Sequence, residues 1–146
     1  MGPFDLKSAL LAKHAQHVVL IHFPIALFMM GVAFDFVAQR TKNAELAAAA
    51  YYNLVVAAVA TLPVVLTGIL AWRFALEGAA LKGILLYHLV LGVTVSMLFW
   101  IVARWHFRAQ RKASPLPGYR WAVQLLALLL VGMTAHLGGF LSGVNG

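Results

Sequence analysis

The sequence contains no cysteine and few charged residues. Without cysteine, the chain can form no disulfide, thiolate metal site, iron–sulfur cluster or covalent c-type haem attachment. Only 10% of its 146 residues are charged and just 4 are acidic, whereas 63% are hydrophobic. A soluble domain does not need so much apolar sequence to build one core, so the composition indicates a membrane protein.

Four apolar runs are each long enough to cross a bilayer, which takes about 20 residues in a helix. They show no alternation of period two, so helices are expected rather than a barrel. We expect an all-α integral membrane protein, a four-helix up-down bundle with a short N-terminal interfacial helix. The spanning helices are predicted at about 18–39, 46–73, 82–104 and 119–142, and the interfacial segment at 1–16.

The chain is interpreted as one transmembrane domain over residues 1–146, with no internal repeat. The first apolar run is too long for the hydrophobic region of a signal peptide, and no cleavage motif follows it. A nucleophile elbow, a phosphate-binding loop and paired carboxylates are also missing, which argues against hydrolysis.

The positive charge lies at the predicted helix ends. A net charge of +7 on one soluble face would suggest nucleic acid, but this distribution suggests membrane topology instead. The first and third connections hold Arg40, Lys42, Arg104, Arg108, Arg111, Lys112 and Arg120; the other side holds Lys7, Lys13, Arg73 and Lys82. The positive-inside rule therefore predicts a multi-pass protein of the cytoplasmic (inner) membrane, with the first group in the cytoplasm and both termini in the periplasm or cell exterior.

Three histidines are predicted at one depth near the periplasmic side. His22 and His88 follow the outer ends of the first and third helices, and His136 precedes the outer end of the fourth. Ionisable groups inside a bilayer are costly and usually face the bundle interior, so they are candidate functional residues. Histidine ligands without cysteine suit b-type haem, copper or zinc.

Glycines beside these histidines favour haem over a bare ion. Gly92 follows His88 on the same helix face, and Gly132 precedes His136 by one turn, which leaves flat surface for a macrocycle. The alternative is that both glycines only allow close helix packing. Arg73 and Lys82, on the same side of the membrane, are candidates to neutralise haem propionates.

The predicted ligand pair is His22 with His88, on diagonal helices, and the second choice pairs His136 with either. His17 lies about 140° around the helix from His22. Three roles stay open for it: a ligand at a second haem site, a contact to a haem propionate, and an interfacial residue. His14 and His106 are expected to be exposed.

A second polar layer is predicted toward the cytoplasmic side, from Asp35, Asn53 and Gln124. It could bind a quinone head group or relay a proton. The simpler interpretation, which we prefer, is that Asp35 pairs with one of Arg40, Lys42 and Arg120.

The segment "HVVLIHFPIALF" resembles the signature of a bacterial four-helix membrane family catalogued as domain of unknown function 2231. That signature reads His, four residues, then His-Phe-Pro-Ile-Ala, and His17 and His22 match its spacing. The later segments "TGILAW" with Gly68, "LLYHLVLG" with His88 and "AHLGGFLSG" with His136 are also similar. Many relatives have proline after the first histidine, where this chain has Val18. The resemblance implies a haem-binding partner of periplasmic cytochromes or dehydrogenases.

The preferred hypothesis is a cytochrome b-like electron-transfer subunit rather than a stand-alone enzyme. One haem b, or two if His17 also ligates, would relay electrons between a periplasmic partner and quinone or another subunit. The alternatives are a copper, zinc or proton transporter or sensor that uses the same histidines, and a scaffold subunit without redox chemistry. Because the chain has so little sequence outside the membrane, we expect it to function within a complex or a homo-oligomer, in contact with membrane lipid.

Overall fold

The computed structural model describes residues 13–112 and 114–143, with side chains from Gln16 onward. This part of the chain forms four helices, α2 (Lys13–Thr41), α3 (Ala44–Phe74), α4 (Gly83–Lys112) and α5 (Arg120–Leu141). All four are long and apolar enough to cross a membrane, which confirms the predicted all-α membrane fold. The predicted interfacial segment lies outside the described residues except for residues 13–16, which begin α2.

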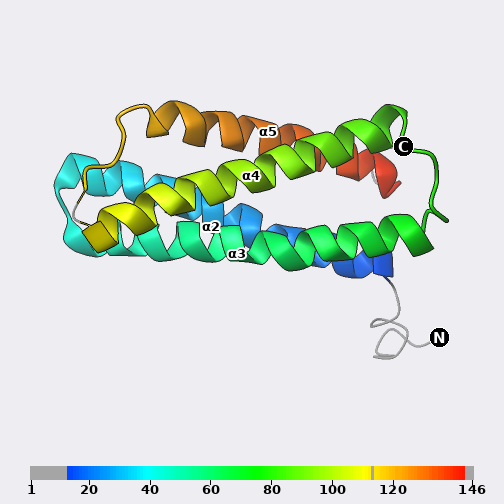
Figure 1. Cartoon of the computed structure of the whole chain (residues 1–146), viewed down its shortest axis with the longest axis horizontal. Helices are drawn as coiled ribbons and strands as arrows, with labels where there is room; N and C mark the ends of the chain where they lie inside the picture. The colour runs from blue at the N-terminus through cyan, green and yellow to red at the C-terminus, as the bar shows by residue number, and fades with distance from the viewer. Residues whose placement is uncertain (1–12, 113, 144–146) are drawn as a thin grey trace.

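The helices run up and down, so the bundle has two distinct ends (Figure 1). The terminal end holds the start of α2, the α3–α4 connection and the end of α5. The connection end holds the α2–α3 turn and the α4–α5 loop. Helices α2 and α4 lie diagonally opposite each other, since the closely packed neighbours are α2 with α3, α3 with α4, and α4 with α5.

Local sequence explains where the helices stop at the connection end. Helix α4 continues to Lys112, eight residues past the predicted boundary at 104, because the first helix-breaking residue after it is Pro115. Between α2 and α3, Lys42 adopts a φ of 57° and reverses the chain. Asn43 then caps α3, because its side chain accepts a hydrogen bond of 3.0 Å from the Leu46 N–H.

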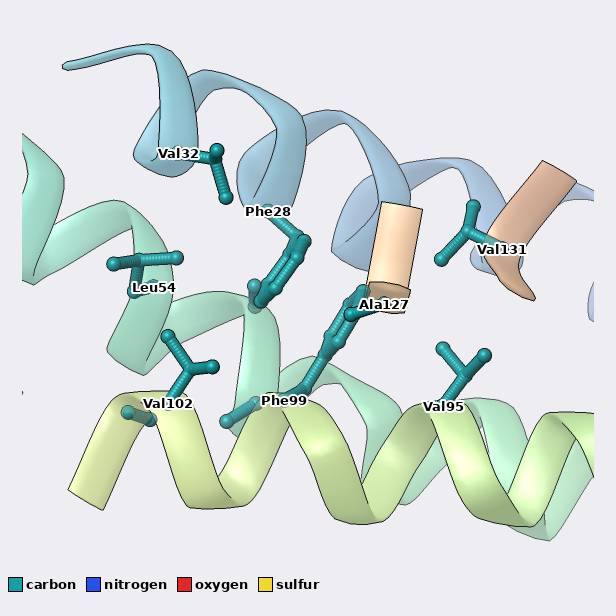
Figure 2. Close-up of a cluster of buried hydrophobic side chains, with 11 residues drawn as sticks. Phe28, Val32, Leu54, Val95, Phe99, Val102, Ala127 and Val131 are labelled. Atoms are coloured by element: carbon teal, nitrogen blue, oxygen red, sulfur yellow. The ribbon is translucent and has the colours of Figure 1, made fainter. Parts of the chain in front are cut away.

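The core is built around two stacked phenylalanines (Figure 2). The rings of Phe28 on α2 and Phe99 on α4 are 3.8 Å apart between centroids and tilted by only 5°. Leu54 and Val102 pack beside this stack toward the connection end, and Ala127 of α5 covers its edge. A cross-bundle aromatic pair therefore fixes the level at which the two diagonal helices meet.

The two hairpins, α2–α3 and α4–α5, share residues and contacts at equivalent positions, which indicates a weak internal repeat that is not predicted from the sequence. A shift of 71 residues takes His17 to His88 and Phe28 to Phe99, and a shift of 70 takes Gly68 to Gly138. The segments 17–28 and 88–99 share five of twelve residues, at His17/His88, Val19/Val90, Leu20/Leu91, Leu27/Leu98 and Phe28/Phe99. Both hairpins start at the same end of the bundle, so this is a parallel repeat with its axis along the bundle.

Candidate functional site

The four histidines predicted as candidate ligands separate into two kinds in the structure. His17 and His88 lie inside their own hairpins, whereas His22 and His136 are exposed on the side of the bundle between α2 and α5. Depth alone, which the sequence gives, does not distinguish these two environments. The distinction depends on which face of each helix meets a neighbour.

His17 joins α2 to α3. Its Nδ1 lies 3.1 Å from the Val64 carbonyl oxygen and 3.3 Å from Thr67 Oγ1. The ring also rests on Gly68, where an added Cβ would come within 3.1 Å of His17 Cε1. The imidazole therefore occupies space next to Gly68 that is free because glycine has no side chain.

His88 makes the equivalent contact between α4 and α5. Its Nδ1 lies 3.0 Å from the Thr134 carbonyl oxygen, and a Cβ on Gly138 would come within 3.1 Å of its Cε1. The structure therefore turns His88 toward α5 and does not bring it to His22, the partner predicted from the sequence. His17 and His88 instead each connect the two helices of their own hairpin at the terminal end.

The His22 ring is oriented so that an unprotonated ring nitrogen faces outward. Its Nδ1 lies 2.7 Å from the Val18 carbonyl oxygen, one turn earlier in α2. A carbonyl only accepts, so Nδ1 carries the proton and the neutral ring keeps its lone pair on Nε2. This is the arrangement by which backbone carbonyls orient metal-ligating histidines.

His22 and His136 lie on facing sides of α2 and α5. A groove at the connection end is lined by Met29, Ala33 and Phe36 of α2 and by Trp121 and Leu125 of α5, among others. His22 precedes Met29 by seven residues and His136 follows Leu125 by eleven, so each lies within about 20° of the helix face that lines the groove. Both histidines therefore continue this groove toward the terminal end.

The two histidines also lie at the same level along the bundle. The rings of Phe36 and Trp121 meet with centroids 5.7 Å apart. His22 lies fourteen residues from Phe36 on α2, and Ala135, the neighbour of His136, lies fourteen residues from Trp121 on α5. Both steps run toward the terminal end and cover about 21 Å at 1.5 Å per residue. Helix geometry therefore predicts that His22 and His136 lie at about the same level on the two helices.

Gly132, one turn before His136 on α5, leaves its surroundings open, since a Cβ built on it would meet nothing within 4 Å. The equivalent groove between α3 and α4 is also open, but it is lined by larger apolar side chains, since Leu62, Leu66 and Val93 take the positions of Gly132, His136 and His22. Helices α3 and α4 also pack closely, whereas α2 and α5 approach closely at only a few positions.

Other predicted site residues lie elsewhere. A Cβ on Gly92 would touch Thr134 Cγ2 at 3.9 Å, so this glycine lies at the α4–α5 contact and supports the packing alternative. Arg73 lies in the last turn of α3 and Lys82 in the α3–α4 connection, so both are on the far side of the bundle from the α2–α5 groove. Among the described residues, no three histidine or carboxylate side chains come together as a metal-ion site.

A polar cluster forms around Asp35, as predicted, but its residues are not all those of the predicted layer. Oδ2 of Asp35 accepts a hydrogen bond of 2.9 Å from Arg120 Nε and one of 3.1 Å from Gln124 Nε2. Arg120 Nη2 also donates to Gln39. The pairing of Asp35 with Arg120 was one of three predicted alternatives, whereas Asn53 bonds to the Ala49 carbonyl of its own helix.

His106 belongs to this buried cluster, so the expectation that it is exposed is wrong. Its side chain is only 5% exposed, and its Nε2 lies 3.6 Å from Asp35 Oδ2. The helical spacing from Phe99 through Val102 to His106 was the available signal, because it places His106 on the buried face of α4. His106 is also the repeat equivalent of Asp35, so the pair meets across the bundle axis as the two phenylalanines do.

Comparison with known proteins identifies a family for this chain. No curated protein and no solved structure gives a significant match. Residues 13–146 match the model of a family described as Predicted membrane protein (DUF2231). This match covers all four helices, and the chain therefore belongs to that family of membrane proteins.

Proposed function

We propose that the chain is a membrane-embedded electron-transfer subunit that binds one haem b in the α2–α5 groove, between His22 and His136. The observation that carries the proposal is the position of these two imidazoles. Helix geometry puts their positions at about one level on facing sides of α2 and α5, which approach closely at only a few points, beside a glycine whose added Cβ would meet nothing within 4 Å.

The donor set suits haem better than a bare ion. Two neutral imidazoles are the usual axial ligands of an electron-transferring b-type haem, whereas a zinc or copper ion usually requires three or more protein ligands. The hydrogen bond from His22 Nδ1 to Val18 holds the ring with Nε2 outward. The glycine at 132 supplies the flat surface that a macrocycle needs.

When bound, the haem would supply reversible one-electron exchange with partners at the membrane surface. The chain would hold both axial positions, which disfavours oxygen chemistry, and its apolar groove would keep water from the cofactor. One haem is proposed rather than two, because His17 and His88 are engaged at helix contacts that a second cofactor would disrupt.

The orientation follows from charge. The connection end carries seven basic residues in its turns and helix ends, so we place it in the bacterial cytoplasm and the haem near the periplasm. The electron partners would then be a periplasmic cytochrome or dehydrogenase on one side and quinone or a membrane subunit on the other. A partner subunit or a second copy would cover the open flank of the groove.

The test is the visible spectrum of protein purified in detergent from haem-supplied cells, reduced minus oxidised, with a pyridine haemochrome assay for stoichiometry. His22→Ala and His136→Ala are expected to abolish the b-type α band. Val93→Ala and Leu66→Ala, the equivalent positions in the α3–α4 groove, are the matched controls and should keep it.

A colourless wild-type protein would overturn the haem proposal, and metal analysis would then test the copper or zinc alternative. An α band that survives in both histidine variants but is lost in His88→Ala would overturn the assignment of the ligands. Size-exclusion profiles and thermal unfolding of each variant separate loss of haem from loss of fold.

A further inference from the structure

The groove between α2 and α5 has a second part, at the connection end, which the proposed haem site does not use. It is a space of about 740 Å³, within the usual size range of ligand sites in proteins. Phe36, Trp121, Leu125 and Leu128 form its walls. Its mouth is polar and basic, with Gln39, Arg40 and Lys42.

The charges at this mouth are available to a ligand. Arg40 and Lys42 are both exposed, and neither has an acidic residue beside it in the lining of the groove. Glu45, in the first turn of α3, follows Lys42 by three residues but forms no ion pair with Lys42 or Arg40 among the described residues, and Asp35 is buried and bonded to Arg120. The groove therefore presents two cations above an apolar channel.

The dimensions of the groove match one half of a bilayer. From Arg40 at its mouth to Met29 at its far end is eleven residues, or about 16 Å of helix. This is close to half of a hydrocarbon core of about 30 Å. A ligand with its charge at the mouth would lay its apolar part along the groove from the membrane surface to the midplane.

We infer that this part of the groove is a binding site for an anionic phospholipid of the leaflet at the connection end. The phosphate would lie between Arg40 and Lys42, and an acyl chain would lie against Phe36, Trp121 and Leu125. Basic pockets between membrane helices bind anionic head groups in this way. The inference does not depend on haem, because it uses different residues at the opposite end of the bundle.

A helix C-terminus attracts basic residues in any case, so the test needs a control for that effect. Arg111 and Lys112 supply it, since they form the basic last turn of α4, at the same end of the bundle, and do not line the groove. The two pairs therefore share charge and lie at or just after a helix C-terminus at the same end of the bundle, but only Arg40 and Lys42 line the groove.

The experiment titrates delipidated protein in detergent with dioleoylphosphatidylglycerol or dioleoylphosphatidylcholine and measures bound lipid by native mass spectrometry. The wild-type protein is expected to prefer phosphatidylglycerol. Arg40→Gln with Lys42→Gln should weaken that preference by about 30-fold, since each basic group near an anionic lipid contributes roughly a factor of five. Arg111→Gln with Lys112→Gln should leave it unchanged.

Two further arms identify what the site recognises. Ala33→Trp fills the groove without changing charge, and it is expected to reduce phosphatidylglycerol binding even though Arg40 and Lys42 remain. Glycerol 3-phosphate alone should not compete. No preference for phosphatidylglycerol, an equal loss in the α4 control, or full competition by glycerol 3-phosphate would each overturn the inference, and thermal unfolding confirms that every variant is folded.

Discussion

The α3–α4 and α2–α5 grooves occupy equivalent places in the internal repeat but carry different side chains. Leu62, Leu66 and Val93 line the first, and helices α3 and α4 pack more closely than α2 and α5. At the equivalent positions of the second are Gly132, His136 and His22. The repeat thus places only apolar side chains at these positions of one groove, and a glycine and two histidines at the same positions of the other.

Positions that the two hairpins share serve a different purpose. His17 with Gly68 and His88 with Gly138 make the same contact twice. Phe28 and Phe99 meet face to face at the axis. The comparison indicates that residues common to both hairpins build the fold, whereas candidate functional residues occur where the hairpins differ.

The largest expected effect comes from the polar cluster at the connection end, where the hairpins differ most. Arg120→Ala gives α5 the residue that α3 has at the equivalent position, Ala50. The change leaves the buried Asp35 carboxylate without its cation, which costs about 3–5 kcal/mol for a buried pair. Thermal unfolding in detergent should show a clear drop, with the exposed Arg104→Ala as control.

A double-variant cycle sharpens this prediction. Adding Asp35→Leu to Arg120→Ala removes the uncompensated charge and should recover most of the lost stability. If Arg120→Ala unfolds at the temperature of the wild type, the cluster does not stabilise the bundle. If the double variant is no better than the single one, its loss has a cause other than the isolated carboxylate.

An intermediate effect is expected at the two glycines beneath the shared histidines. Gly68→Ala and Gly138→Ala each bring a Cβ to 3.1 Å from an imidazole carbon, and relief requires the ring to shift in a packed contact. Such overpacking typically costs about 1–3 kcal/mol. The two variants should lower the unfolding temperature by similar amounts, because the contacts are equivalent.

Gly132→Ala is the matched control, because its Cβ enters open space and alanine favours a helix by about 0.8–1 kcal/mol over glycine. In a His88→Ala background the cost of Gly138→Ala should disappear. A large loss in one hairpin and none in the other would contradict the equivalence of the two contacts.

The sequence predicts the helices well because the length of an apolar run and the cost of a buried charge are local properties. It also places His22, His88 and His136 near one level, since counting residues from helix ends needs no knowledge of packing. Which of them meets a neighbouring helix depends on rotation about each helix axis, and that is decided by tertiary contacts such as the Phe28–Phe99 stack.

The same reason limits what the sequence shows of the polar cluster. Asp35 had three candidate partners within reach, and only the fold selects Arg120. His106 is expected to be exposed from the sequence because it follows the predicted helix end at 104 and has basic residues around it, which obscure the helical spacing from Phe99. The internal repeat is hard to see in the sequence because only five of twelve residues are identical in segments 17–28 and 88–99, while the remainder of each hairpin has diverged.

The smallest effect on stability is expected from a variant that makes the two grooves alike. Gly132→Leu gives α5 the residue that α3 has at the equivalent position, Leu62. The new side chain enters open space, so stability should change by no more than about 1 kcal/mol. A leucine there would occupy the surface proposed for the macrocycle, and the b-type α band should be lost while the fold persists. The reciprocal control, Leu62→Gly, should lose some stability and keep the band. A Gly132→Leu protein with full haem content would place any cofactor outside this groove, because a leucine and a macrocycle cannot share the same face of α5.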